Sequence, residues 1–153
     1  MRRVVVLGRG GAGKSILAAR LGTALDLPVV ELDKHFWPPD LTPMPKERWA
    51  AVQRGLVRDA RWVLDGDLGP YDVLPVRLRA ADTVVVLAFP LWRCTWRALR
   101  RSRENRAFWH WLLTYRRRGL PTVLAAVAEH AGGAAVHVLR HPRAVERFLA
   151  AAG

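Results

Sequence analysis

The sequence of 153 residues contains a single cysteine, Cys94, only three lysines and no long apolar run. One cysteine excludes both an intrachain disulfide framework and a zinc finger built from several cysteines. No segment approaches the roughly 18 consecutive apolar residues that a membrane-spanning helix needs. The apolar run behind Arg2 and Arg3 is too short for a signal peptide. These absences predict a soluble cytoplasmic protein with no membrane partner.

Acidic residues are also few: 25 Lys and Arg stand against 13 Asp and Glu, which gives a formal net charge of +12. Because only three of the cations are lysines, 22 are arginines. Such an excess has three interpretations: nucleic-acid binding, binding of small phosphorylated ligands, or a solvated surface that follows genome composition. The charge is uneven, because nine arginines gather in one stretch with only Glu104 opposing them. They are Arg93, Arg97, Arg100, Arg101, Arg103, Arg106, Arg116, Arg117 and Arg118.

Short β-branched runs alternate with helical segments along the chain, and hydrophobic residues make up 51% of it, enough for a packed core. Strands are predicted at 2–7, 28–32, 61–64, 83–89 and 134–139. Helices are predicted at 14–25, 46–60, about 91–130 with a break near 119–121, and 143–150; residues 35–45, rich in Pro and aromatics, are predicted as a loop. Strands that alternate with helices indicate a parallel sheet covered on both faces, in one domain over 1–153.

Residues 8–15 read GRGGAGKS and match the P-loop (Walker A) pattern G-x-x-x-x-G-K-[ST]. Closely spaced glycines let successive backbone N–H groups point at phosphate oxygens, and the helix that follows adds its positive N-terminus. Lys14 would meet the β- and γ-phosphates and the Ser15 hydroxyl would ligate Mg²⁺. The alternative is a plain glycine turn. The strand before the motif and the helix after it favour nucleotide binding.

A P-loop that binds Mg²⁺ usually has a carboxylate at the end of a neighbouring strand. Asp65 is the first candidate, because it follows the apolar strand Trp62-Val63-Leu64, and Asp33 at the end of the second strand is the second candidate. Each could instead be an exposed or capping aspartate. Ligands of open parallel sheets bind at the carboxyl ends of the strands, where both residues are expected to lie.

Four segments together resemble a known family: GRGGAGKS, ELDKHFW, RWVLDGD and DTVVVLAFPLWRCTWRALRRSR. They look like the adenylate-kinase-like P-loop kinases, and most like the small proteins called DNA topology modulation proteins or adenylate kinase-related kinases. The resemblance implies a P-loop NTPase three-layer α/β sandwich, with a five-stranded parallel sheet in the order 2-3-1-4-5. It also implies a short acceptor-side insertion at about 34–60, an arginine-rich lid-like region at about 91–118, and ATP and Mg²⁺ as cofactors.

The resemblance assigns roles to individual positions. Lys14 and the lid arginines Arg93, Arg97 and Arg101 would stabilise the transferring phosphoryl group, while Asp33 would face the acceptor. Ser15 and Asp65 would hold the metal. The nucleotide would be bound by Gly8, Arg9, Gly10, Gly11, Ala12, Gly13, Lys14, Ser15 and Ile16, with Arg140 and Arg143 near the adenine.

The sequence departs from the family at two places. Ala88 stands where the fourth strand often ends in Asp, and Asp65-Gly66 is followed by Asp67-Leu68-Gly69 instead of the acceptor signature Phe-Pro-Arg. AMP is therefore not the expected acceptor. The sequence predicts phosphoryl transfer from ATP, with Mg²⁺, to a small acceptor that it does not identify. Two alternatives stay open: a nucleotide-binding regulator acting on nucleic acid, and a nucleotide binder without catalysis.

Overall fold

A computed structural model describes residues 1–40, 42–90 and 119–153. The lid-like arginines of the sequence analysis lie outside these residues. The described elements follow the order β1 (Arg3–Gly8), α1 (Lys14–Leu25), β2 (Val29–Glu31), α2 (Leu32–Phe36), α3 (Lys46–Leu56), β3 (Trp62–Asp65), η1 (Gly69–Tyr71), α4 (Leu74–Ala80), β4 (Thr83–Leu87), α7 (Leu120–His130), β5 (Ala135–Leu139) and α8 (Pro142–Ala152).

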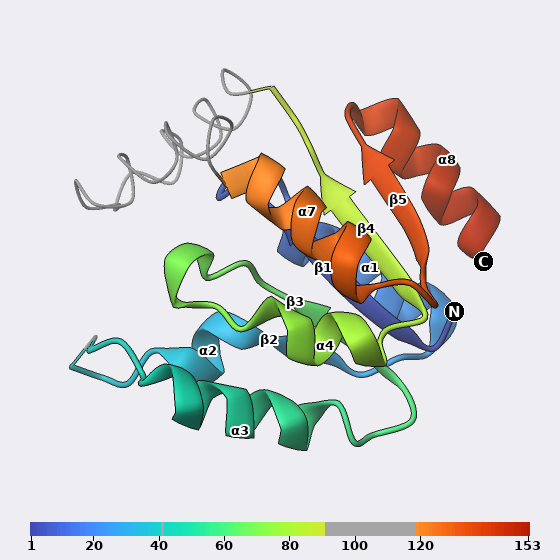
Figure 1. Ribbon diagram of the computed structural model, residues 1–153. Helices are drawn as coiled ribbons and strands as arrows, with labels where there is room; N and C mark the ends of the chain where they lie inside the picture. Colours follow the sequence, from blue (N-terminus) through green and yellow to red (C-terminus); the bar gives the residue numbers. More distant parts are fainter. Residues whose placement is uncertain (41, 91–118) are drawn as a thin grey trace.

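The five strands form one parallel sheet in the order β2-β3-β1-β4-β5, which confirms the predicted fold (Figure 1). The central strand β1 pairs with β3 on one side and β4 on the other. The registers Val6 with Asp65, Glu31 with Asp65 and Gly8 with Leu87 bring the carboxyl ends of β1, β2, β3 and β4 to the same edge. The loops that follow these strands therefore meet there.

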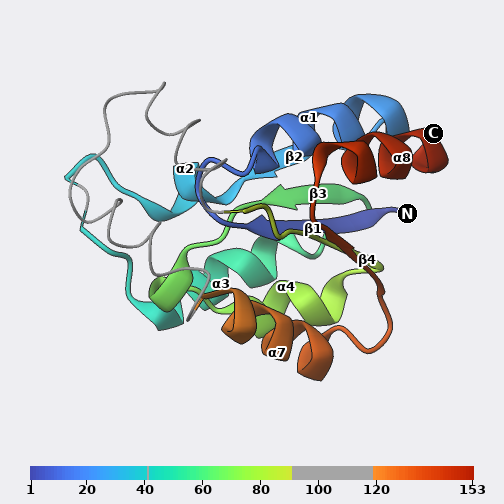
Figure 2. The same ribbon diagram turned by 90° about the horizontal axis from the view of Figure 1, so that it is seen from above.

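Helices cover both faces of the sheet, and each face has its own apolar core (Figure 2). The α1 and α8 face buries Leu17 and Leu21 of α1 against the sheet, and Leu25 packs at the margin, as the four-residue leucine spacing predicts. The opposite face is covered by α3, α4 and α7, where Trp49 and Leu78 are fully buried. No helix in the described ranges is long and apolar enough to cross a membrane.

Several boundaries differ from the sequence prediction. The second strand stops at Glu31, and residues 32–36 form the short helix α2 where strand end and loop were predicted. Leu32 and Phe36, four residues apart, are both buried. The helix has only five residues, so it is stabilised by the packing of these side chains and not by its own hydrogen bonds. Helix α3 ends at Leu56 and not at residue 60, and α4 was not predicted at all.

Candidate nucleotide-binding and catalytic site

The P-loop connects β1 to α1 through a backbone path that requires glycine. Gly8, Gly11 and Gly13 have φ values of 142°, 74° and 95°, which L side chains rarely adopt. A Cβ atom on Gly8 would lie 2.7 Å from the carbonyl oxygen of Leu87, so the loop runs directly against β4. The chain can therefore curl around a ligand only with glycine at these positions.

Lys14 is the first residue of α1, and its Nζ donates a hydrogen bond to the carbonyl oxygen of Arg9 at 3.3 Å. The backbone N–H of Ala12 donates to the same carbonyl at 3.2 Å, which closes the loop. Helix α1 begins after Gly13 without a side-chain cap, so its first N–H groups are not used by a capping side chain. Arg9 is buried, whereas Ser15 and Ile16 are exposed at the start of the helix.

Asp65 ends β3 and lies between β1 and β2 in the sheet, with only 4% of its surface exposed. Its Oδ1 atom has no hydrogen-bond partner among the described residues. Burial raises the pKa of its carboxyl group, while the Ser15 hydroxyl bond and the charge of Lys14 act in the opposite direction. Asp65 is thus a buried carboxylate beside the P-loop, with one oxygen available to a ligand.

The sequence predicted Asp33 at the end of the second strand, but in the structure it lies in the first turn of α2. It keeps contact with solvent. Even so, partial burial raises the pKa of its carboxyl group, Lys14 lowers it, and the nearby carboxylates of Asp65 and Asp67 raise it further. Lys14 begins α1 directly after the loop that follows β1, and Asp65 ends the neighbouring strand β3, so both lie at the same end of the sheet.

Asp67 belongs to this group of charges, although no sequence pattern indicated a role for it. It is 7% exposed, and its Oδ1 accepts a hydrogen bond from the backbone N–H of Gly69 at 3.1 Å. The only sequence signal was its place after Asp65-Gly66, where the family signature has an aromatic residue. The structure therefore adds a third carboxylate to the two that were predicted.

Aromatic rings lie beside these acids. Phe36 packs edge-on against Trp37 and Trp49, with ring centroids 4.8 Å and 5.2 Å apart, and both Phe36 and Trp49 are fully buried. Trp37 and Tyr71 form the outer part of the cluster, 5.9 Å apart, and Tyr71 is 43% exposed. The backbone N–H of Trp37 donates to the carbonyl of Asp33, so this aromatic surface begins next to the acid.

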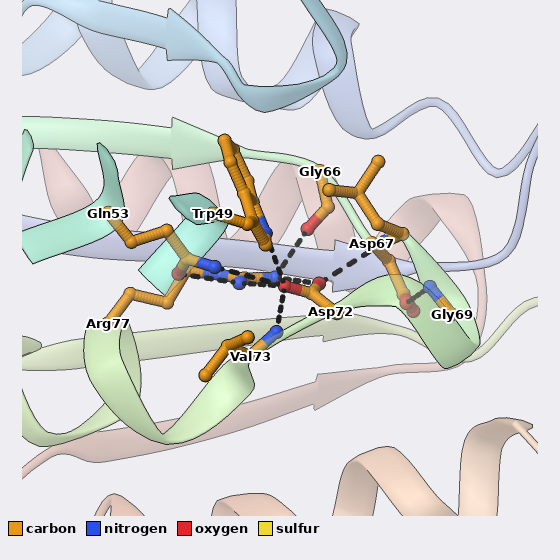
Figure 3. A network of polar contacts seen from close by, with 9 residues as sticks. Trp49, Gln53, Gly66, Asp67, Gly69, Asp72, Val73 and Arg77 are labelled. Atoms are coloured by element: carbon orange, nitrogen blue, oxygen red, sulfur yellow. Dashed lines mark hydrogen bonds and ion pairs between the residues drawn. The ribbon is translucent and has the colours of Figure 1, made fainter. Parts of the chain in front are cut away.

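A buried ion pair supports the loop after β3 (Figure 3). The Nη2 atom of Arg77 on α4 lies 2.6 Å from Asp72 Oδ2, and the two side chains are 0% and 1% exposed. Asp72 accepts six hydrogen bonds, whose donors are Trp49 Nε1, Gln53 Nε2, the N–H groups of Leu68 and Val73, and Arg77 Nη1 and Nη2. No local sequence pattern indicated this network, because its members come from α3, the loop and α4.

The other predicted residues have mixed outcomes. Arg140 follows β5 and Arg143 lies in the first turn of α8; both are exposed, and Arg140 lies at the same sheet edge as the P-loop. His141 caps α8 by accepting a hydrogen bond from the Ala144 N–H at 3.1 Å. Arg93, Arg97 and Arg101 fall outside the described residues, so their phosphate contacts stay predictions.

A comparison of the chain with protein-family models finds no match, and neither does a comparison with curated proteins. Solved structures do match. Shikimate kinase from Acinetobacter baumannii in complex with shikimate is 17% identical, with a TM-score of 0.66 over 99% of this chain and 90% of that one. A gluconokinase from Sinorhizobium meliloti 1021 is 16% identical, with a TM-score of 0.59 over 99% and 89%.

Deoxyadenosine kinase from M. mycoides with bound dCTP is 13% identical, with a TM-score of 0.55 over 97% of both chains. At such low identity the likeness concerns the fold. The resemblance to the DNA topology modulation subgroup is not confirmed by these matches, whereas the broader resemblance is supported. The chain therefore shares the fold of these solved kinases, a five-stranded parallel sheet with helices on both faces.

Proposed function

We propose that this protein is a kinase that transfers the γ-phosphoryl group of ATP to a hydroxyl group of a small acceptor. The observation that carries the proposal is the arrangement at one edge of the sheet, where Lys14 begins α1 after the glycine loop, the buried Asp65 ends β3, and Asp33 lies in the first turn of α2. A cation for phosphates next to carboxylates for a metal and an acceptor is what phosphoryl transfer requires. The three solved structures compared above are each named as kinases, which supports the same reaction class.

In this proposal the loop Gly8–Ile16 binds the phosphates through its backbone N–H groups and Lys14. The positive φ values of its glycines support that role. Arg140 and Arg143 would contact the base of the nucleotide. Arg93, Arg97 and Arg101 would neutralise charge on the transferring group, as cationic side chains do in this reaction class.

Ser15 and Asp65 fit a Mg²⁺ site. The buried Asp65 Oδ1 has no hydrogen-bond partner among the described residues, and the Ser15 hydroxyl is close enough to lower the pKa of that carboxyl group. The described ranges contain no cluster of three or more His, Cys, Asp or Glu side chains that would form a site made of protein ligands alone. That suits Mg²⁺, which binds through one or two carboxylates and takes its other ligands from water and phosphates. When bound, the ion would neutralise charge on the phosphate oxygens.

Asp33 would accept a hydrogen bond from the acceptor hydroxyl and take its proton. A general base works best when its pKa approaches the working pH, and partial burial and the neighbouring carboxylates raise the pKa of Asp33 in that direction. Trp37 and Tyr71 would form one wall for the acceptor, because they begin next to Asp33 and Tyr71 remains exposed.

The test is a phosphoryl-transfer screen with Mg-ATP over nucleoside monophosphates, nucleosides and small hydroxyl metabolites. We expect turnover with one acceptor class and none in an Asp33→Asn variant that still binds ATP. Asp59→Asn is the matched control, because Asp59 is an exposed aspartate between α3 and β3. ATP binding without turnover over the whole panel would contradict the proposal and favour a nucleotide binder without catalysis.

A further inference from the structure

Arg77 is a fully buried arginine whose hydrogen bonds reach the loop that carries the acids of the site. Its Nη1 atom donates to Gln53 Oε1 at 3.0 Å and to Asp72 Oδ1 at 2.7 Å. Its Nη2 atom donates to Asp72 Oδ2 at 2.6 Å and to the carbonyl oxygen of Gly66 at 3.1 Å. The fork of the guanidinium thus joins α3, the loop after β3 and its own helix α4 (Figure 3).

The loop is fixed at several points of its backbone. The carbonyl oxygen of Gly66 accepts a hydrogen bond from Arg77. The backbone N–H of Leu68 donates to Asp72 Oδ2 at 3.2 Å, and the backbone N–H of Gly69 donates to Asp67 Oδ1. Gly66 itself has a φ of 150°, and a Cβ there would lie 2.9 Å from the Cβ of Leu32. The turn therefore has little freedom while the network is intact.

This turn separates two carboxylates of the site. Asp65 precedes Gly66, and the nearby Ser15 hydroxyl of the P-loop lowers its pKa; Asp67 follows Gly66 and raises the pKa of Asp33. The peptide carbonyl held by Arg77 belongs to the residue between them. A change in the direction of that peptide would move both carboxylates relative to Lys14 and Ser15.

Stability alone gives no reason for burying these charges. Replacing a buried ion pair by apolar side chains of similar volume is often neutral or stabilising. What only arginine provides is a planar fork that makes parallel bonds to a carboxylate and still reaches a carbonyl. Lysine carries the same charge but has no such fork. Replacing Arg77 with lysine therefore keeps the charge and removes only the oriented pair of hydrogen bonds.

We propose that Arg77, locked by Asp72, is a positioning residue that holds the 65–67 turn so that the Asp65 carboxylate faces the P-loop. The inference rests on the proposed kinase function, because it assigns a purpose to the carboxylates of that site. Loss of the fork should then weaken the use of Mg²⁺ before it affects the binding of ATP phosphates. Groups that orient metal ligands typically contribute about 10–100-fold in metal affinity or activity.

The experiment compares Arg77→Lys with Leu78→Ala, which truncates the next residue of α4, a fully buried leucine in the apolar core. Both variants should melt at a lower temperature than the parent protein. Only Arg77→Lys should raise the Mg²⁺ concentration needed for half-maximal transfer, by about 10–100-fold, and lower kcat with little change in KM for ATP. Arg79→Lys on the exposed side of the same helix should match the parent protein.

Two further measurements keep the outcomes apart. Gln53→Met removes one bond to Arg77 and one to Asp72, and should shift the Mg²⁺ requirement in the same direction by a smaller factor, even if Arg77→Lys does not fold. Direct Mg²⁺ titration of binding to a non-hydrolysable ATP analogue, with amide exchange at residues 66–69, needs no turnover. An unchanged Mg²⁺ requirement in Arg77→Lys and Gln53→Met would overturn the inference, whereas absent turnover in the parent protein would overturn only the proposed function.

Discussion

Asp65 and Asp72 lie at the two ends of one short segment, and both carboxylates are buried, but their surroundings are opposite. Asp72 accepts six hydrogen bonds. Burial opposes its charge, but Arg77 and the hydrogen bonds from Leu68 and Trp49 lower its pKa overall. Asp65 keeps one oxygen without a partner among the described residues, and burial raises its pKa. A fully satisfied carboxylate supports structure, while an incompletely satisfied one beside a P-loop costs stability and is available to a ligand.

The two regions around these residues differ in the same way. The P-loop is shaped by backbone geometry, because Gly8, Gly11 and Gly13 have positive φ values and helix α1 begins directly after them. The turn after β3 is held by side chains from α3 and α4. Positions that need only glycine can be recognised from a short motif, whereas positions that need three elements to meet cannot.

The largest expected effect is on chemistry. Lys14→Ala removes the cation that acts on Asp65 and Asp33, and should lower phosphoryl transfer by at least about 10²-fold, the loss typical for one charge-stabilising donor. Lys34→Ala is the control, because Lys34 is an exposed lysine paired with Glu31 at 2.7 Å. Steady-state rates with Mg-ATP measure the effect. Full activity in Lys14→Ala would contradict the proposal that the P-loop binds ATP for phosphoryl transfer.

The next effect is on stability at Asp72. Asp72→Leu leaves Arg77 buried without its carboxylate and should reduce the free energy of unfolding by about 3–5 kcal/mol, as breaking a buried pair does. The double variant with Arg77→Met should recover part of that loss, because no buried charge remains. Urea denaturation measures both. If the double variant were less stable than Asp72→Leu alone, the ion pair would not be the source of the cost.

The pH dependence sharpens the comparison further. Because the pKa of Asp72 is lowered on folding, its stabilisation is present above its unfolded pKa of about 3.9 and is lost as the pH falls through the folded value. The midpoint of thermal unfolding should therefore fall more steeply below about pH 4 in the parent protein than in Asp72→Asn. If the unfolding midpoint fell equally steeply with pH in the two proteins, the partners of Asp72 would not lower its pKa as described.

The strands and α1 could be predicted because they follow from periodicity and from the P-loop, which are local patterns, whereas the strand order came only from the resemblance to the adenylate-kinase-like P-loop kinases. Helix α2 could not, since five residues of which Leu32 and Phe36 are buried carry no helical period of their own. A solvated surface was one interpretation of the arginine excess, and the fully buried Arg77 does not fit it. Its partners are Gln53 and Asp72, 24 and 5 residues away, and no spacing rule joins them.

The smallest expected effect is a gain. Asp65→Asn replaces a buried carboxylate that lacks one partner, so in buffer without Mg²⁺ it should increase the free energy of unfolding by about 1 kcal/mol while abolishing Mg²⁺-dependent transfer. The exposed Asp59→Asn should stay within about 0.5 kcal/mol of the parent protein. Thermal melts with and without Mg²⁺ make the measurement, since added Mg²⁺ and ATP should stabilise the parent protein but not Asp65→Asn. A loss of stability in Asp65→Asn would place Asp65 with Asp72, among the carboxylates that hold the fold.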